Sequence, residues 1–239
     1  DKLQAEDDDP DFVAEDRKLT MDKVGGIEFL LGKFTGTEAL SRLFEFRLEV
    51  TSDNLQVAAT DVIGKPVGFR IEDDEDISPD HAAEPREFHG VITAIHAGQR
   101  SSDHRDYTLV VSPWLWYLTK RTNCRIFQKK TVVQIVEEVL GAAPNASFDK
   151  SNVHATYPEL TYCVQYDETD FAFVSRLLEE NGIFYFFRFA KGSHKLILAD
   201  SANAWTNATS PATVTLAAPH MDWKREDAIA SCVLEQRVT

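Results

Sequence analysis

The chain has 239 residues, a formal net charge of −14 and a hydrophobic fraction of 43%, which allows one large domain or two small ones with a substantial core. It has no run of 18 apolar residues, so we expect no membrane span and no stable membrane anchor. The acidity is concentrated in residues 1–16, with a net charge of −7, and in Glu72–Asp76, with −5. The rest is nearly neutral, and without a basic face we expect no nucleic-acid partner.

The first half of the chain predicts an acidic tail followed by strands. Residues 1–18 are dominated by acidic side chains and are expected to be disordered. Strands are then predicted over 26–34, 43–54, 67–71, 89–96 and 106–112. In the clearest of them, Phe44 to Val50, apolar and charged residues alternate strictly, which indicates one buried face. Strands without intervening helices indicate an antiparallel barrel or sandwich.

After Pro113 the pattern becomes mixed. A short helix is predicted over 114–118, and Thr131 with Gln134 forms a capping box that opens a helix over 132–140, ended by Gly141. A strand over 161–166 precedes a helix over 170–180, with Thr169 as its N-cap. We expect Gly182 to end that helix in the left-handed conformation. Further strands are predicted over 183–187, 195–199, 213–216 and 231–238.

The strand over 183–187 is apolar at every position, including Phe184, Tyr185, Phe186 and Phe187. Such a run does not alternate, so it predicts a strand that is covered on both faces. One interpretation is an ordinary core strand. The other is that part of this surface meets another chain, which makes these four residues a possible subunit interface.

Signatures of catalysis and metal binding are absent from the sequence. It contains no nucleophile elbow, phosphate loop, HExxH motif or paired CxxC motif. The acidic run 72–76 lacks the spacing and the glycine of a calcium loop. We therefore predict no catalytic, cofactor-binding or metal-binding residues and no enzymatic activity.

Individual histidines, tryptophans and cysteines also favour structural roles. His89 and His96 are seven residues apart on a predicted strand and would point to opposite faces, which does not favour a shared metal. Trp114 and Trp116 lie in a dense apolar run and are expected in the core, although indole rings can stack on a sugar. The three cysteines, at 124, 163 and 232, are expected to be reduced and mostly buried.

Three stretches, taken together, resemble one known family. They are SRLFEFRLEVTSDN (41–54), SPWLWYLTKRTNCRIFQKKTVVQIVEEVL (112–140) and YDETDFAFVSRLLEENGIFYFF (166–187). In this order they look like the N-terminal hub region of VgrG proteins, the valine-glycine repeat spike proteins of type VI secretion. That family is related to contractile phage tail hubs and to Rhs-element proteins. The resemblance covers about residues 25–239.

The resemblance implies a mainly β (α+β) fold, an antiparallel β-barrel of the phage tail hub type with an inserted α+β domain. The first barrel would comprise 19–112 completed by 220–239, and the insertion would comprise 113–219. Family members continue into an oligonucleotide/oligosaccharide-binding-type barrel and a β-helix needle. The 239 residues stop before both, so we expect neither a needle nor a toxin domain within them.

The resemblance also implies a function as a structural hub of the spike. The full-length form would be a homotrimer that sits on a tube of hexameric rings and carries effector or adaptor proteins. It would reside in the bacterial cytoplasm before firing and then be secreted or injected into the target cell. One alternative is the hub of a contractile phage tail or related particle. A carbohydrate-binding or hydrolytic barrel is another, because a catalytic carboxylate pair needs only spatial closeness.

Overall fold

A computed structural model describes residues 19–71, 85–204, 215–216 and 228–229. The chain divides into two compact units, of which the first ends at Ser201. In the second, the described elements are η2 (Ala202–Ala204) and the parallel pair β12 (Thr215–Leu216) and β13 (Ala228–Ile229). The predicted tail 1–18, the acidic run 72–76 and the predicted strand 231–238 lie outside the described residues. The predicted boundary near residue 220 lies there as well, and it stays a prediction.

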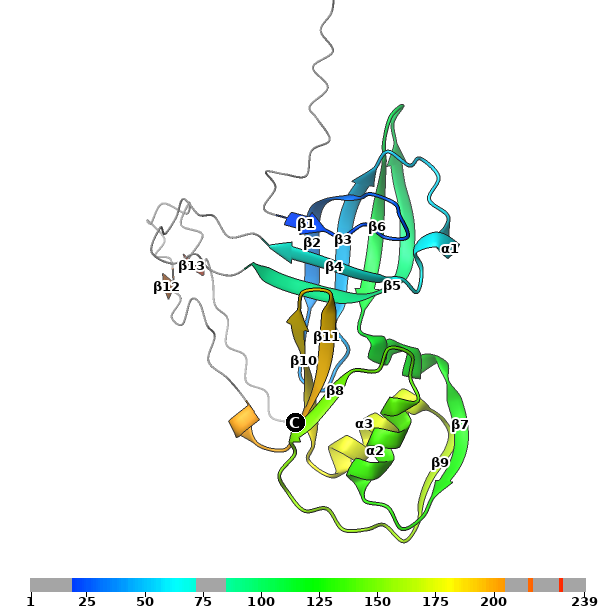
Figure 1. The fold of residues 1–239 in the computed structure, drawn as a ribbon, viewed down its shortest axis with the longest axis vertical. Helices are drawn as coiled ribbons and strands as arrows, with labels where there is room; N and C mark the ends of the chain where they lie inside the picture. Colours follow the sequence, from blue (N-terminus) through cyan, green and yellow to red (C-terminus); the bar gives the residue numbers. More distant parts are fainter. Residues whose placement is uncertain (1–18, 72–84, 205–214, 217–227, 230–239) are drawn as a thin grey trace, which may run out of the picture. The chain divides into compact units, whose positions relative to one another are not determined.

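The first unit begins with a six-stranded antiparallel sheet in the order β1-β4-β5-β6-β3-β2 (Figure 1). Its strands are β1 (Leu19–Met21), β2 (Leu30–Thr37), β3 (Glu45–Ser52), β4 (Pro66–Ile71), β5 (Arg86–Arg100) and β6 (Arg105–Ser112). The sheet curls so far that its end strands β1 and β2 come into contact, which makes a nearly closed barrel. The short helix α1 (Ala59–Val62) lies between β3 and β4. The predicted class, mainly β with a hub-type barrel, is confirmed.

The barrel interior combines aliphatic side chains with a cluster of phenylalanine rings. The predicted alternation of β3 is confirmed, since Phe46, Leu48 and Val50 are buried. Phe46 contacts five other phenylalanine rings with centroids 4.7–6.5 Å apart. Phe69 and Phe88 stack on each other across neighbouring strands at 5.0 Å. These close ring contacts fix the inner face of the barrel.

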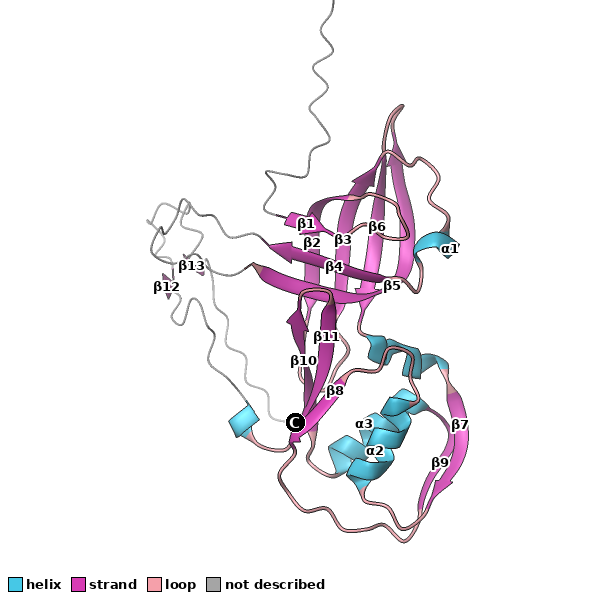
Figure 2. Ribbon diagram, in the orientation of Figure 1, coloured by secondary structure: helices cyan, strands magenta, loops and turns pink. Residues whose placement is uncertain are grey.

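The region after Pro113 is an α+β insertion. Its elements are η1 (Trp114–Lys120), β7 (Thr122–Phe127), α2 (Val132–Gly141), β8 (Phe148–Asn152), β9 (Cys163–Thr169), α3 (Asp170–Glu180), β10 (Phe184–Ala190) and β11 (Ser193–Ala199). Strands β10-β11-β8 form one sheet, and β7 with β9 forms a two-stranded ribbon. Figure 2 shows α2 and α3 between the ribbon and the three-stranded sheet. The sequence did not predict β7 and β8, because neither alternates cleanly.

Both helices of the insertion begin as predicted. The side chain of Thr131 accepts a hydrogen bond from the Gln134 amide, and the Gln134 side chain accepts one from the Thr131 amide, which completes the capping box. Thr169 caps α3 through the Ala172 amide. Gly182 follows α3 at φ +68°, the left-handed conformation expected of a C′ glycine. The end of α2 is different, because Gly141 is its last residue and Ala142 is the C-cap.

A buried carboxylate joins the ribbon to the helices of the insertion. Asp170 is fully buried and accepts hydrogen bonds from Arg121, Asn123, Arg125 and Gln165 at 2.5–2.9 Å. Burial pushes the pKa of this carboxyl up, but these hydrogen bonds and the charge of Arg125 outweigh it and hold the pKa below its ordinary value. Asp170, the acidic residue in the first turn of α3, is thus the centre of an ion cluster.

Candidate functional site: the junction between barrel and insertion

Strand β10 connects the interior of the insertion with the interior of the barrel. It pairs antiparallel with β11 over its whole length, from Phe184 opposite Ala199 to Ala190 opposite Ser193. Along one face, Tyr185 lies in the insertion core, Phe187 packs against both cores and Phe189 packs against the barrel core. The ring of Phe44, from the barrel, contacts Phe187 at 5.0 Å and Phe189 at 5.2 Å. The aromatic side chains of β10 therefore pack into two hydrophobic cores of the same chain, that of the insertion and that of the barrel.

The four residues predicted as a possible subunit interface divide between the two faces of β10. Tyr185 is 1% exposed, and burial raises the pKa of its hydroxyl to about 12. Phe187, half-buried, shares its face. Phe184 and Phe186 are half-buried on the opposite face, where the guanidinium of Arg188 lies 5.5 Å from the centre of the Phe186 ring. An interface at these four residues stays a prediction.

The junction also contains a pair of histidines that the sequence did not reveal. His89 of β5 and His194 of β11 face each other with 2.8 Å between their Nδ1 atoms. The other nitrogen of His194, Nε2, accepts a hydrogen bond from the backbone N–H of Trp114 at 2.9 Å. His194 is buried, whereas His89 is half-buried. The pair joins the barrel to two elements of the insertion, η1 and β11.

Burial controls the protonation of both rings. It lowers the pKa of His89, against the opposing charge of Asp22. Burial, together with repulsion from the charged form of His89, also lowers the pKa of His194 to about 3. Both rings are therefore neutral near pH 7. The sequence placed His89 and His96 on one strand but gave no sign of His194, because the contact spans 105 residues.

A hollow of about 450 Å³ lies beside the junction. It is lined by the β2–β3 turn, by the end of α3 and by the start of β10, including Leu40, Arg42, Glu179 and Phe184. Backbone contacts fix one wall, because the Ser41 amide donates to the Tyr185 carbonyl at 2.8 Å. Apolar and charged groups line this hollow together, which suits a protein contact better than a small reactive substrate.

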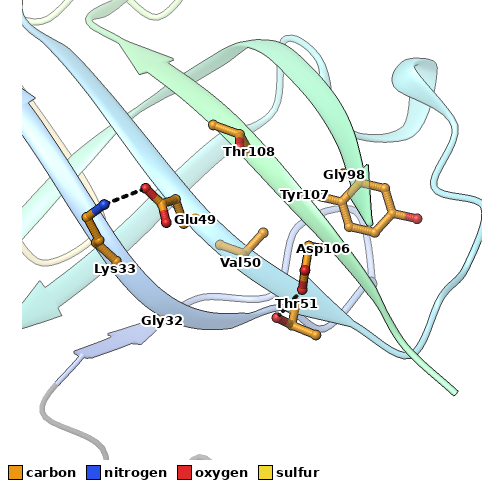
Figure 3. A pocket seen from close by; sticks show the side chains of 9 residues that line it. All are labelled: Gly32, Lys33, Glu49, Val50, Thr51, Gly98, Asp106, Tyr107 and Thr108. Carbon is orange, nitrogen blue, oxygen red and sulfur yellow. Dashed lines mark hydrogen bonds and ion pairs between the residues drawn. The ribbon is translucent and has the colours of Figure 1, made fainter. Parts of the chain in front are cut away.

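A second hollow, of about 340 Å³, lies on the barrel where β2, β3, β5 and β6 meet (Figure 3). Gly32 and Gly98 line it and contribute no side chain. Its polar groups are already paired, because Lys33 binds Glu49 at 2.8 Å and Thr51 donates to Asp106 at 3.0 Å. This arrangement offers no activated nucleophile and no paired acid and base.

The ribbon carries an exposed apolar face that the sequence did not predict. Of the large hydrophobic side chains exposed in the described part of the chain, Ile126, Tyr162 and Tyr166 belong to this ribbon or its edge, with exposures of 62%, 57% and 79%. Asp167 has φ +49° at a register irregularity between β7 and β9. Such bulges turn neighbouring side chains outward. Tyr162, Val164 and Tyr166 alternate with the buried Cys163 and Gln165 ahead of this bulge, and alternation alone does not indicate which face of a strand is exposed.

Other residues singled out in the sequence have mostly structural positions. Trp114 is in the insertion core, as predicted, while Trp116 is half-buried under the Lys120 ammonium. Cys163 is buried and Cys124 is exposed, so the expectation of a buried thiol is wrong at Cys124. Cys232 lies outside the described residues.

The described residues, 19–71, 85–204, 215–216 and 228–229, offer neither a cluster of metal ligands nor a membrane-spanning helix. They contain no group of three or more histidine, cysteine, aspartate or glutamate side chains placed to hold a metal ion. The helices in the same ranges are all too short or too polar to cross a membrane.

The barrel and its insertion place the chain among hub-type β-barrels, and the comparison with known proteins gives the family. Residues 37–239 match the family described as phage tail baseplate hub (GPD). This match covers most of the chain, so the chain belongs to that family. The resemblance to VgrG proteins is confirmed at the level of individual relatives.

The type VI secretion system spike protein VgrG1b of Pseudomonas aeruginosa is 34% identical over 212 residues, which are 88% of this chain and 28% of that protein. The Escherichia coli c3393 protein is described as a type VI secretion component with structural similarity to the T4 tail proteins gp27 and gp5. It is 26% identical, with a TM-score of 0.68 over 84% of this chain and 52% of that chain. A PdpA–VgrG complex shares the fold, at 12% identity and a TM-score of 0.54, over 71% of this chain and 30% of that chain. The chain thus spans less than a third of VgrG1b.

Proposed function

We propose that the chain is the hub portion of a type VI secretion spike, a structural part that joins the spike to the secretion tube and does no chemistry. The observation that carries this proposal is the 34% identity to VgrG1b over 88% of the chain. The structural similarity to the c3393 protein, with a TM-score of 0.68 over 84% of this chain, supports it. The first hub barrel would comprise 19–112 with 220–239, and the insertion 113–219.

In the full-length protein the hub would form a homotrimer, stand on the hexameric tube protein and carry effector or adaptor proteins. It would wait in the bacterial cytoplasm and leave the cell on firing, helping to puncture the target membrane. The face of β10 with Phe184 and Phe186, next to the 450 Å³ hollow, is the surface we assign to the neighbouring subunit. Obligate interfaces are large and apolar, and half-buried aromatic rings beside a hollow suit such a contact.

The test compares two aromatic positions in the longer protein that carries this chain. Phe186→Asp should shift the trimer to monomers in multi-angle light scattering, because it places a charge in an apolar interface. Tyr166→Asp, on the exposed ribbon face, serves as the matched control and should leave the trimer intact. An unmodified protein that stays monomeric at high concentration would refute the hub proposal. A normal trimer of Phe186→Asp would refute only the assignment of this surface.

A further inference from the structure

The histidine pair at the junction takes part in a series of hydrogen bonds that runs from the Trp114 amide through His194 to His89. Because the Trp114 N–H donates to His194 Nε2, that nitrogen carries no hydrogen. A neutral imidazole has one N–H, so the hydrogen of His194 is on Nδ1 and points at His89 Nδ1, 2.8 Å away. His89 Nδ1 is therefore an acceptor, and the hydrogen of His89 is on Nε2. The geometry alone fixes the tautomer of both rings.

This chain of hydrogen bonds has no place for another proton. A proton on His194 Nε2 would face the Trp114 N–H and break that hydrogen bond. A proton on His89 Nδ1 would face the Nδ1–H of His194 across 2.8 Å. The first event breaks the hydrogen bond that holds the His194 ring to η1 within the insertion, and the second breaks the hydrogen bond between barrel and insertion. Each also places a charge in a buried site.

The surroundings of the pair give a charged ring little support. Asp22, which follows β1 and donates its backbone amide to Gly68 of β4, is the charged group that favours the protonated form of His89. The other neighbours are aromatic: Phe44, which directly precedes β3, and Phe187 of β10 contact His194 with ring centroids 5.6 and 6.0 Å apart. Phe189 of β10 lies opposite His194 in the register. In the described residues, neither ring has a hydrogen bond or ion pair to a carboxylate.

We propose that His89 and His194 form an acid-sensitive latch between the barrel and the insertion, closed while both rings are neutral and opened by protonation of either. No covalent step is involved, and each ring takes up one proton from solvent. Both pKa values are lowered in the folded chain. The latch therefore contributes its full stability above the ordinary histidine pKa of about 6.5 and loses it as the pH falls below that value.

The hydrogen exchange of the Trp114 amide in the full 239-residue chain tests the latch. The protection factor of this amide, corrected for the intrinsic effect of pH on exchange, should fall at least about tenfold between pH 7.5 and 5.5. This is the change expected when opening is coupled to the uptake of one proton, because the coupling acts over the pH unit below the ordinary histidine pKa of about 6.5. Amides of β3 should keep their protection. An unchanged Trp114 protection factor over this range would overturn the proposal.

Two substitutions on β5 separate the latch from a general effect of pH. His89→Asn keeps an acceptor oxygen near the position of Nδ1 but cannot titrate, so the fall in Trp114 protection should become clearly smaller. The matched control is His96→Asn, at an exposed position of the same strand, and it should respond like the unmodified chain. An identical response of both variants would contradict the latch.

Nitrogen chemical shifts of the imidazole rings in the unmodified chain test the latch even if His89→Asn fails to fold. Folded His194 should show the Nδ1–H tautomer and should not titrate between pH 7.5 and 5.5. Folded His89 should show the Nε2–H tautomer and a pKa below its ordinary value. A pKa near 6.5 for either ring in the closed, folded chain would refute the proposal.

Discussion

The barrel and the insertion differ in what holds their interiors together. The buried polar residues of the described barrel are Ser52 and Ser112, and its core consists of phenylalanine and aliphatic side chains. The insertion buries Asp170 and Gln165 completely. A closed sheet needs no such group, because its strands support one another, whereas an isolated two-stranded ribbon is marginally stable in water. The ion cluster at Asp170 links that ribbon to the helices, and so supplies the support that neighbouring strands give in a larger sheet.

The largest expected effect tests the apolar half of this comparison. Phe46→Ala removes a ring that is 1% exposed and contacts five others, so it should cost about 4 kcal/mol of unfolding free energy. Urea denaturation measures the cost, and hydrogen exchange should accelerate first in β3 and β6. The cost should be the same at pH 7 and pH 4, since no titrating group is removed. A cost below about 1 kcal/mol would mean that the barrel closes around the cavity.

The second effect tests the ionic half. Asp170→Ala should cost about 3 kcal/mol at pH 7, because it leaves the partners of a buried carboxylate without an acceptor. The pKa of Asp170 in the folded chain is below the ordinary value. The stabilisation of the fold by the ionised carboxylate is therefore present above about pH 4 and is lost as the pH falls through the folded pKa. The gap between the variant and the unmodified chain should therefore narrow in acid. Glu179→Ala, an exposed acid on the same helix, is the control and should cost under about 0.5 kcal/mol.

A smaller effect is expected at Gly182, which connects α3 to β10. No atom lies within 4 Å of a Cβ built on it, so a side chain there is opposed only by the positive φ. Gly182→Val should cost on the order of 1 kcal/mol or slightly more, and Gly182→Asn should cost less, because asparagine tolerates the left-handed region. Thermal unfolding of the two variants side by side measures the difference. Equal midpoints would show that the conformation of this residue changes on substitution.

The smallest effect is expected on the outer surface of the barrel. The ion pair Lys33–Glu49 is more than half exposed on both sides, so Lys33→Ala should change the unfolding free energy by less than about 0.5 kcal/mol. Added salt should reduce even this difference, because it screens exposed charges. A loss of several kcal/mol of unfolding free energy in urea denaturation would show that an ion pair stabilises the barrel strongly. The barrel and the insertion would then not differ in their dependence on polar interactions.

The sequence predicted what depends on neighbours along the chain. The alternation in β3, the capping box at Thr131 and the turn at Gly182 are local signals, and the structure confirms each of them. Contacts across long separations left no such signal. His89 meets His194 across 105 residues. Asp170 likewise accepts hydrogen bonds from Arg121, Asn123 and Arg125, which are 49, 47 and 45 residues away in sequence. The period of two over Tyr162 to Tyr166 predicted a strand there, but it did not indicate that the apolar face of this strand is the exposed one.

The placement of Phe187 and Phe189 has a consequence for how such hubs can be recombined. The insertion contributes these two rings to the barrel interior, so it is not an interchangeable module with a boundary at Pro113. A chimera that takes residues 113–201 from a relative also replaces the partners of Phe44, which contacts both rings. A chimera should therefore fold best when the residue at position 44 comes from the same relative as Phe187 and Phe189, its two contact partners. The segment to exchange thus includes part of the barrel.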